Sequence, residues 1–290
     1  MKLTLKNTNN SDAERLVIRK EEKPCMDSSW HYHAQYELLY VSQSTGIRFV
    51  GDNVSHFAPG ELVLVGPYLP HLWRNDPSYY SDDELNDVQT PMVKTIVIRF
   101  HTNFIGEGTF NNPEFYEISN LLEQSNYGVS FGMKTSKKLS KELLQIVDMT
   151  PAEKSIKLLD ILCRLSLAED KIVLSSTDMR QYTTDNSQRI DTVLKYISAN
   201  YTNDINLQEV SDIACMTTNS FCRFFKKITN KSFTEFLNEI RIRNAARLLI
   251  QEDLSIAEIC NLVGYNSITN FYRQFVQIMH TTPKGYRINL

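Results

Sequence analysis

The chain has 290 residues, of which 42% are hydrophobic, and a formal net charge of −3. This length predicts roughly two domains, and this hydrophobic content excludes a disordered chain. No apolar run reaches the roughly 18–20 residues of a membrane span, and the first twenty residues lack the apolar core of a secretory signal. Five scattered cysteines predict reduced thiols in a cytoplasmic protein without a membrane partner.

The first part of the chain, residues 1–110, reads as short β-strands. Four β-branched or aromatic runs, ELLYV, GIRFV, ELVLV and KTIVIRF, are bounded by glycine, proline, asparagine and aspartate. The turn signals GDN and PGE lie between them. Short strands at this spacing predict a small β-barrel or jelly roll.

Two histidines and a glutamate are grouped in the stretch WHYHAQYE. If this stretch is a strand, alternation places His31, His33 and Glu37 on one face. His71, which follows the ELVLV run, is a candidate fourth member. Imidazole and carboxylate groups bind divalent metals such as zinc, manganese, iron or nickel. The pattern therefore predicts either a metal site or a polar pocket that hydrogen-bonds a small molecule.

Residues 111–174 read as helices, because their apolar residues recur every three or four positions. Three segments show this spacing: PEFYEISNLLEQS, SKKLSKELLQIV and PAEKSIKLLDILCRLSLA. Pro151 opens the last segment, and proline suits the first turn of a helix. The apolar stripe of this helix is too broad for a lone surface helix. We expect part of it to pack on the barrel and part to form a homodimer contact.

A polar segment, residues 175–187, reads as a linker. Helical patterns fill the remainder, residues 188–290. From Ser187 to Leu290 there are 12 Lys and Arg against 9 Asp and Glu, so the basic excess of the chain lies wholly in this region. Charge counted by domain therefore leaves room for a nucleic-acid partner, although the whole chain is acidic.

The C-terminal region contains an internal repeat. SFCRFFKKITNKSFTEF matches NFYRQFVQIMHTTPKGY at an offset of 50 residues, and NLQEVSDIACM matches SIAEICNLVGY at an offset of 49. Each upstream piece opens with a capping-box pattern, Asn206-x-x-Glu209 and Ser255-x-x-Glu258, which marks a helix N-terminus. Each half is therefore predicted to be a helix-turn-helix.

The second helix of each predicted motif has an apolar face and a polar face. Arginine can bind guanine bidentately, asparagine can read adenine, and threonine can contact a base edge or the thymine methyl. The outward residues are thus either DNA-reading residues or an ordinary solvated helix face. The candidates for reading DNA are Thr218, Asn219, Cys222, Arg223, Lys226, Ser267, Thr269, Asn270 and Arg273. Candidate phosphate contacts near the helix ends are Lys227, Lys231, Lys284 and Arg287.

The segment FTEFLNEIRIRNAARLLIQ separates the two copies. It predicts a helix of about 18 residues, roughly 27 Å long. A rigid spacer of that length holds two reading helices near one duplex turn apart, roughly 34 Å. One chain would then contact successive major grooves of double-stranded DNA.

Residues 188–287 closely resemble the DNA-binding domain of the AraC/XylS family of bacterial transcription regulators. The segments FCRFFKKITNKSF, RIRNAARLLIQEDLSIAEICNLVGY and FYRQFVQIMHTTPKGYR carry the resemblance. It implies a seven-helix domain in which the helices Thr218–Thr229 and Ser267–His280 enter the major groove. It also implies a small-molecule effector and RNA polymerase as partners. The chain departs from the family at Asn230 and His280, where glycine is usual.

The His-x-His-x-x-x-Glu pattern with its later histidine resembles the signature motifs of the cupin superfamily. The resemblance runs from about Trp30 to Asn75, and its second motif is incomplete because Tyr68 stands where cupins usually carry glycine. Regulators of the AraC type commonly bind an effector in such a domain without chemistry. The candidate effector-pocket residues are His31, His33, Glu37, His71 and Trp73, and the first four are also the candidate metal ligands.

Taken together, these patterns predict an α+β protein with a cupin-like barrel, flanking helices and an all-α tandem helix-turn-helix domain. The predicted function is a sequence-specific transcription regulator that responds to a small effector and has no catalytic residues. No cofactor is expected, unless a divalent metal occupies the pocket. Two alternatives stay open: a metal-dependent cupin oxygenase or isomerase fused to a DNA-binding module, and an architectural DNA-binding protein without an effector.

Overall fold

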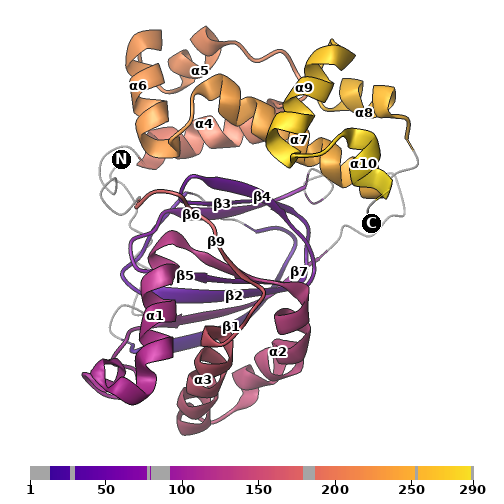
Figure 1. Cartoon of the computed structure of the whole chain (residues 1–290). Coiled ribbons are helices and arrows are strands. Elements are labelled where there is room, and N and C mark those ends of the chain that lie inside the picture. The colour runs from indigo at the N-terminus through magenta and orange to yellow at the C-terminus, as the bar shows by residue number, and fades with distance from the viewer. Residues whose placement is uncertain are drawn as a thin grey trace. The chain divides into compact units, whose positions relative to one another are not determined.

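The computed structural model describes residues 14–26, 30–76, 79, 92–178, 187–251 and 254–288, and it divides near residue 185 into two compact units. The N-terminal unit combines sheets and helices, whereas the C-terminal unit is helical (Figure 1). Within these ranges no helix has both the length and the apolar character that crossing a bilayer requires. The predicted α+β class with an all-α C-terminal part is confirmed.

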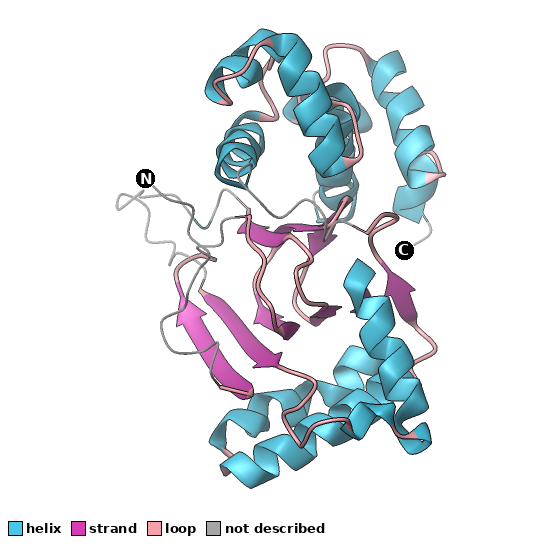
Figure 2. Ribbon diagram, turned by 90° about the vertical axis from the view of Figure 1, so that its left-hand side faces the viewer, coloured by secondary structure: helices cyan, strands magenta, loops and turns pink. Residues whose placement is uncertain are grey.

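The described part of the N-terminal unit contains two sheets (Figure 2). The smaller sheet has the order β4 (Asn53–Phe57), β3 (Gly46–Val50) and β6 (His71–Asn75). The larger sheet is antiparallel throughout. Its order is β1 (Leu16–Lys23), β7 (Val93–Phe100), β2 (Tyr36–Gln43), β5 (Glu61–Val65), β8 (Val129–Phe131) and β9 (Lys171–Val173).

Alternation along the strands of the larger sheet creates two hydrophobic layers. One face, which carries Leu38 and Ile98, is covered by helices (Figure 1). The opposite face, which carries Leu39 and Val63, packs against residues of the smaller sheet such as Trp73. The covering helices are α1 (Tyr116–Gln124), α2 (Met133–Gln145) and α3 (Pro151–Ser166). Short 3-10 turns η3 (Thr109–Asn111), η4 (Pro113–Phe115), η5 (Ser125–Tyr127) and η6 (Ile146–Asp148) connect or extend these helices.

The four strands and three helices predicted for this unit are confirmed as β2, β3, β5, β7 and α1 to α3. Thr150 and Glu153 form a complete capping box at α3, with Pro151 in its first turn. Five strands were not predicted. β1 lies at a sheet edge and ends in the charged run RKEEK, which hides its pattern, while β8 and β9 have three residues each. Because α1 to α3 share a core with the larger sheet, the predicted segments 1–110 and 111–174 form one unit.

The C-terminal unit contains seven helices among its described residues, the number that the family resemblance implied. The first motif comprises α5 (Leu207–Ile213) and α6 (Thr218–Thr229), and the second comprises α8 (Ile256–Leu262) and α9 (Ile268–Met279). The remaining helices are α4 (Ser187–Asn200), α7 (Phe233–Gln251) and α10 (Pro283–Ile288). The predicted tandem helix-turn-helix is therefore present.

The sequence repeat is also a repeat in packing. In the first motif the rings of Phe225 and Phe236 meet edge to face with centroids 5.2 Å apart. In the second, Phe275 and Tyr286, which are 50 residues further along, meet in the same way at 5.8 Å. Aromatic pairs in this geometry stabilise a core by about 0.5–1.5 kcal/mol beyond the area that they bury. Each half therefore has the same aromatic anchor beneath its second helix.

The helix caps repeat less faithfully. At α8, Ser255 and Glu258 form the complete capping box that the sequence predicts. At α5, the Asn206 side chain accepts the hydrogen bond of the Glu209 N–H at 2.9 Å. The reciprocal bond predicted for the Glu209 carboxylate is wrong, because that carboxylate accepts the hydroxyl of Tyr196 on α4 instead. The competing partner comes from another helix, so the local pattern could not disclose it.

Helix α7 links the two motifs and is buried on more than one side. Ile240 and Ile242, two residues apart, are both fully buried, and residues two apart lie on different faces of a helix. The Arg241 guanidinium donates to the carbonyl of Tyr201 at 2.7 Å and lies 5.6 Å from the ring centre of Tyr265. It thereby joins the turn after α4 to the second motif. These contacts hold α7 between the two helix-turn-helix motifs.

Candidate DNA-binding surface and histidine cluster

Helices α6 and α9 are held by matching N-caps. Thr217 accepts a hydrogen bond from the Ser220 N–H at 3.3 Å, and Ser267 accepts one from the Asn270 N–H at 3.4 Å. Ser267, a predicted reading residue, thus has a structural function at the start of α9. The apolar stripes beneath, with Phe221 and its counterpart Phe271 fully buried, fix which face of each helix turns outward.

The predicted reading residues lie on the outward faces. Thr218 and Asn270 are half-buried, whereas the others are exposed: Asn219, Cys222, Arg223, Lys226, Ser267, Thr269 and Arg273. The Arg273 guanidinium donates to the side-chain oxygen of Asn270 at 2.7 Å, which orients both groups. The two motifs therefore present an arginine at the same outward position, Arg223 and Arg273, surrounded by amide, hydroxyl or ammonium groups.

Both reading helices end in a left-handed residue. Asn230 has φ 56° and His280 has φ 55°, at the two positions where the resembling family usually has glycine. Asparagine visits this region readily, and a histidine does so less often. At His280 the backbone N–H donates to the carbonyl of Val276 at 3.0 Å, which closes the last turn. The helix therefore ends as the glycine-containing helices are expected to end, with some backbone strain.

The four predicted phosphate contacts differ in their surroundings. Lys227 and Lys284 are exposed. The Lys231 ammonium is 2.5 Å from the Glu239 carboxylate. The Arg287 guanidinium donates to the carbonyls of Leu249 and Leu254, at 3.3 and 2.6 Å, and so ties α10 to the end of α7. Lys231 and Arg287 therefore already stabilise the fold of the C-terminal unit.

In the N-terminal unit, His31, His33 and His71 come together. Each offers a ring nitrogen, and these nitrogens all lie within 4.8 Å of one another. The ring centroids are 4.3 Å apart for His31 and His71 and 5.1 Å apart for His33 and His71. Two backbone features hold the cluster: an antiparallel bridge pairs His31 with His71, and the Tyr68 N–H donates to the His33 carbonyl at 2.8 Å.

Backbone carbonyls lie beside two of these rings. His33 Nδ1 lies 2.9 Å from the Gln35 carbonyl oxygen, and His71 Nδ1 lies 2.8 Å from the Leu69 carbonyl oxygen. A carbonyl only accepts, so His71 Nδ1 carries a proton, whereas both nitrogens of His33 face acceptors, because its Nε2 is near Glu37 Oε2. His71 Nε2 is buried and makes no hydrogen bond among the described residues. Its lone pair is therefore available at the centre of the cluster.

Glu37 stands beside the histidines but is held from the other side. The Arg99 Nε donates to Glu37 Oε2 at 2.6 Å, across the register pair that joins β2 to β7. His33 Nε2 is 3.1 Å from the same oxygen, and His71 Nε2 is 3.9 Å from Oε1. The carboxylate is buried, so the Arg99 guanidinium is its main compensating charge.

Burial dominates the protonation of this cluster. It lowers the pKa of His71 well below its usual value, and the nearby His31 lowers it further. Burial alone would raise the pKa of Glu37, but the hydrogen bond from His33 and the charge of Arg99 outweigh it and hold this pKa well below the ordinary range. At neutral pH His71 is therefore neutral and Glu37 is ionised.

The local structure differs from the strand expected for the WHYHAQYE stretch. β2 begins at Tyr36, so His31 and His33 precede the strand, and the alternation argument for placing these two residues is wrong. They converge because the bridge to His71 and the bond from Tyr68 draw the segment against β6. Tyr68 has φ 59°, the left-handed conformation that a glycine supplies without strain. The loop thus keeps this conformation without the glycine of the resembling motif.

Trp73 is buried between the sheets, with its ring 5.8 Å from that of His71 and edge to face with it. A second buried polar group lies further along the same layer. Arg48 on β3 donates to Glu61 on β5, and to Ser130 on β8 at 3.3 Å. Burial raises the pKa of Glu61, although the charge of Arg48 opposes this. Glu37 pairs with Val65 and Glu61 pairs with Val41, so the two buried glutamates lie four residues apart along the β2–β5 ladder, or about 13 Å.

Comparison with known proteins addresses the C-terminal unit. A family model described as "Helix-turn-helix domain" matches residues 210–289. The chain is 30% identical over 104 residues to the regulatory protein PocR of Salmonella typhimurium, covering 36% of this chain and 34% of PocR. The C-terminal domain of AraT, a response regulator from Geobacillus stearothermophilus, is 28% identical and matches 37% of this chain and 89% of that domain, with a TM-score of 0.35. The chain carries an AraC-type helix-turn-helix domain.

The curated relatives match only part of the chain. A longer match, to the uncharacterized HTH-type transcriptional regulator YdeC of Bacillus subtilis, is 24% identical over 154 residues. It covers 52% of this chain and 53% of YdeC, so the chain spans about half or less of the curated relatives described here. The likeness of the N-terminal unit to cupins stays a prediction.

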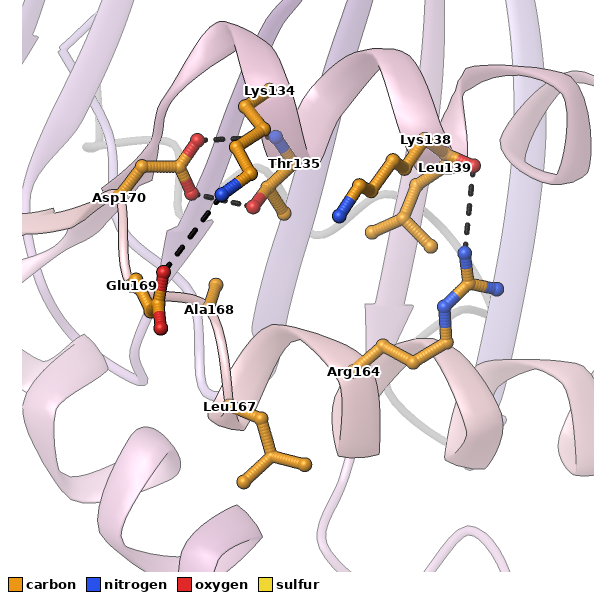
Figure 3. A pocket seen from close by; sticks show the side chains of 9 residues that line it. All are labelled: Lys134, Thr135, Lys138, Leu139, Arg164, Leu167, Ala168, Glu169 and Asp170. Carbon is orange, nitrogen blue, oxygen red and sulfur yellow. Dashed lines mark hydrogen bonds and ion pairs between the residues drawn. The ribbon is translucent and has the colours of Figure 1, made fainter.

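A pocket of about 380 Å³ lies between α2, the end of α3 and the segment that leads into β9 (Figure 3). Two of its charged groups, Asp170 and Arg164, already have partners on α2. Asp170 accepts hydrogen bonds from the N–H and hydroxyl of Thr135 near the start of α2, and Arg164 binds Glu142 at 2.5 Å and the carbonyl of Lys138 at 3.4 Å. These contacts cap α2 and brace α2 against α3. The pocket is a weaker candidate site than the histidine cluster for that reason.

Sequence reasoning missed two members of the interior. Arg99 lies in the run KTIVIRF and Arg48 in GIRFV, each a single arginine in an otherwise mostly apolar strand. A charge in a strand with buried neighbours is seldom tolerated without a partner, and that signal could have identified both. The carbonyls of Gln35 and Leu69 had no such signal, because any residue supplies a carbonyl.

Proposed function

We propose that this chain is a sequence-specific DNA-binding transcription regulator that responds to a small effector bound in its N-terminal unit. The observation that carries the proposal is the pair of outward helix faces with Arg223 and Arg273 at equivalent positions, within an AraC-type domain. Folding does not require the same polar side chain at the same exposed position of both motifs, because a solvated helix face needs no such repetition. The two equivalent faces suit two successive major grooves.

Base recognition is assigned to the arginines together with the short polar residues beside them. Arg223 and Arg273 would bind guanine, while Asn219 and Thr269 would contact neighbouring base edges. Lys227 and Lys284, both exposed, would bind phosphate and fix the register without reading sequence. Lys231 and Arg287 would add to this only by leaving or sharing their present partners.

The spacing of the reading helices also supports the proposal. α7 has 19 residues and therefore a length of about 28 Å. With its buried faces it holds α6 and α9 at a fixed separation that is compatible with one duplex turn, about 34 Å. We expect a bipartite operator whose two half-sites lie about 10 base pairs apart.

The effector is assigned to the layer between the sheets. His31, His33, Glu37, His71 and Trp73 gather there, and buried polar groups of this kind are typical of the convergent polar set of a ligand site. Effector binding would alter operator binding or the contact with RNA polymerase. A homodimer contact is assigned to α3, where Ile156 is 68% exposed, together with Leu167, the residue that follows the helix and is 66% exposed.

The test is a selection of binding sites from a random duplex library with the purified full chain. The expected result is an enriched two-part motif that binds more weakly as the salt concentration rises, since phosphate contacts release counterions. Binding without any enriched sequence would favour the architectural DNA-binding alternative. Size-exclusion chromatography with light scattering tests the dimer, which Ile156→Glu should convert to monomer.

The histidine cluster also favours a second candidate, a metal-dependent oxygenase or isomerase joined to a DNA-binding domain. Such an enzyme would retain a metal on purification without chelator and would need it for turnover. Metal-free protein that still selects and binds a DNA sequence supports the regulator and disposes of the enzyme.

A further inference from the structure

The nature of the effector is suggested by the three imidazoles. Histidine nitrogens rarely converge in a protein interior, because each buried nitrogen needs a partner. Here three rings offer nitrogens within 4.8 Å of one another, and His71 Nε2 has no hydrogen-bond partner among the described residues. A group that binds a lone pair at the centre of the cluster would satisfy it. A cation is such a group, and a hydrophobic ligand is not.

The orientation of the rings also suits a cation. Histidines that bind metals typically donate their other N–H to a backbone carbonyl or carboxylate, which fixes the ring and its tautomer. His33 and His71 both do so, through Gln35 and Leu69. The opposite nitrogens then face other groups: His71 Nε2 has no hydrogen-bond partner among the described residues, and His33 Nε2 lies 3.1 Å from Glu37 Oε2. This support comes from the backbone and is independent of the proximity of the three rings.

Glu37 departs from the ligand set that the motif suggested. Its Oε2 receives the Arg99 Nε at 2.6 Å, and β2 and β7 hold the two residues in register. The ligand atoms that lie within 4.8 Å of one another come from the three imidazoles and do not include a Glu37 oxygen. Since Arg99 compensates the carboxylate, His33 can give its Nε2 lone pair to a cation in place of the Glu37 contact without leaving a buried charge unpaired. Glu37 therefore acts from outside the set of ligands.

We propose that His31, His33 and His71 bind a first-row divalent transition metal, with zinc as the type case, and that this metal is the effector. Glu37 is a positioning residue that Arg99 keeps out of the coordination sphere. Three imidazoles prefer zinc, cobalt, nickel or copper to magnesium and calcium, which take oxygen ligands. That the metal is the effector rests on the proposed regulatory function. The metal site itself does not depend on that function.

The spacing requires a small adjustment. Nitrogens bound at about 2.0–2.1 Å around a tetrahedral zinc lie about 3.4 Å apart. The widest pair here is at most 4.8 Å apart. Rotation of His31, which is only half-buried and precedes β2, can supply the closure. Binding would then fasten the segment before β2 to the start of β6, where the bridge between His31 and His71 already lies.

Binding is measured on the full chain after treatment with EDTA and removal of the chelator. Calorimetric titration with Zn²⁺ should give one ion per chain, and Co²⁺ should give visible absorption bands in the range of a four-coordinate site. Mg²⁺ at the same concentrations should give neither. Zn²⁺ should also raise the melting temperature of the N-terminal unit by several degrees, because it binds the folded form.

Variants identify the ligands. His31→Ala should lower zinc affinity at least 100-fold, and it is the variant least prone to misfolding because His31 is half-buried. His71→Asn is the second ligand variant, with folding checked by circular dichroism. His101→Ala, a half-buried histidine at the end of β7, is the matched control and should bind zinc as the parent does. Glu37→Gln should keep one ion per chain with affinity reduced roughly 10- to 100-fold.

The results separate the two proposals. If the parent protein does not bind zinc, the metal site is overturned, whatever the DNA experiments give. It is also overturned if folded His31→Ala and His71→Asn bind zinc as the parent does. Glu37→Gln that loses zinc as completely as the histidine variants overturns its place outside the coordination sphere. If zinc binds but changes affinity for a library-selected duplex by less than about twofold, the metal is not the effector. Failure to select any duplex overturns the regulatory function and leaves the metal measurement intact.

Discussion

Cys215 and Gly264 occupy equivalent positions in the two helix-turn-helix motifs, 49 residues apart, and both have a left-handed backbone, with φ 53° and 87°. Each lies in the turn between the two helices of its motif. The second turn has the residue that this conformation favours, and the first does not. The tandem copies therefore share a backbone geometry that their sequences support unequally.

Cys215→Gly should stabilise the C-terminal unit. A left-handed residue with a side chain costs roughly 1–2 kcal/mol, and glycine removes most of that cost while adding some unfolded-state entropy. The expected gain is about 1 kcal/mol, measured by urea unfolding of the full chain. Cys163→Gly is unsuitable as a control because it lies inside α3, so Cys163→Ala, also an exposed cysteine, serves instead and should be nearly neutral.

Gly264→Ala should do the opposite. A methyl group there would lie 2.6 Å from the carbonyl oxygen of Thr202, and the residue would also be strained at φ 87°. We expect a loss of more than about 2 kcal/mol, because the neighbouring atom is backbone and cannot rotate away. A neutral result would mean that the turn near Thr202 can shift freely.

Arg223→Ala and Arg273→Ala should each weaken binding to a selected duplex by about 1–3 kcal/mol and relax the base preference in one half-site. Lys227→Ala should weaken all sequences alike and reduce the slope of log affinity against log salt. Lys137→Ala, an exposed cation on α2, is the control that removes the same charge outside the DNA-binding unit. Fluorescence anisotropy at several salt concentrations measures these effects. Full affinity in both arginine variants would refute the assigned reading faces.

Tyr68→Gly tests the loop that supports His71. Tyr68 is 47% exposed and has φ 59°, so its ring contributes little burial while its backbone is strained. Glycine should stabilise the N-terminal unit by about 1 kcal/mol, because it adopts the left-handed conformation without strain. Thermal unfolding measures the change. Destabilisation would show that the contact between the Tyr68 and Tyr32 rings, whose centroids are 6.4 Å apart, outweighs the strain.

Arg99→Ala should destabilise the N-terminal unit strongly. The buried Glu37 carboxylate would lose the guanidinium at 2.6 Å, and removing one partner of a buried ion pair costs about 3–5 kcal/mol. Arg99 is partly exposed, and Glu37 would keep its hydrogen bond with His33, so we expect a loss near the lower end of that range. The double variant Glu37→Leu with Arg99→Met should lose less than Arg99→Ala, because no charge is left alone. Equal losses would indicate that Arg99 acts by packing.

The sequence was most informative where a pattern is local. The offset between Phe225 and Phe275 located α6 and α9, because a buried stripe at helical spacing determines the outward face. It was less informative where distant segments decide the structure. Glu209 was expected to cap its own helix, but Tyr196 on α4 takes its carboxylate. The helix pairing that brings Tyr196 there is a tertiary property.

The histidine site shows the same division. The structure brings His31, His33 and His71 together, yet the reason given for the first two, alternation along a strand, was wrong. Glu37, which the motif puts with them, has its carboxylate held by Arg99, 62 residues later, and its metal binding stays a prediction. Side-chain chemistry can be read from a sequence, but the partner of a buried charge depends on strand register.

A last prediction concerns Asp52, in the turn between β3 and β4. Its carboxylate accepts the hydroxyl of Ser175 at 2.9 Å and the N–H and hydroxyl of Ser176 at 2.9 and 2.5 Å. Gly51 allows this close approach, since a Cβ there would lie 2.4 Å from the Ser175 hydroxyl oxygen. Asp52 therefore anchors the first residues of the predicted linker, residues 175–187, to the N-terminal unit.

Asp52→Ala should remove the hydrogen bonds that anchor Ser175 and Ser176. Three donors lose their acceptor at a largely buried position, and an unsatisfied buried donor costs about 1–3 kcal/mol. We expect faster cleavage between the two units in limited proteolysis and a loss of about 2 kcal/mol in the unfolding of the N-terminal unit. Asp148→Ala, an exposed aspartate in the same unit, should change neither. If Asp52→Ala is cleaved at the parental rate and unfolds at the same urea concentration, the anchoring function assigned to Asp52 is wrong.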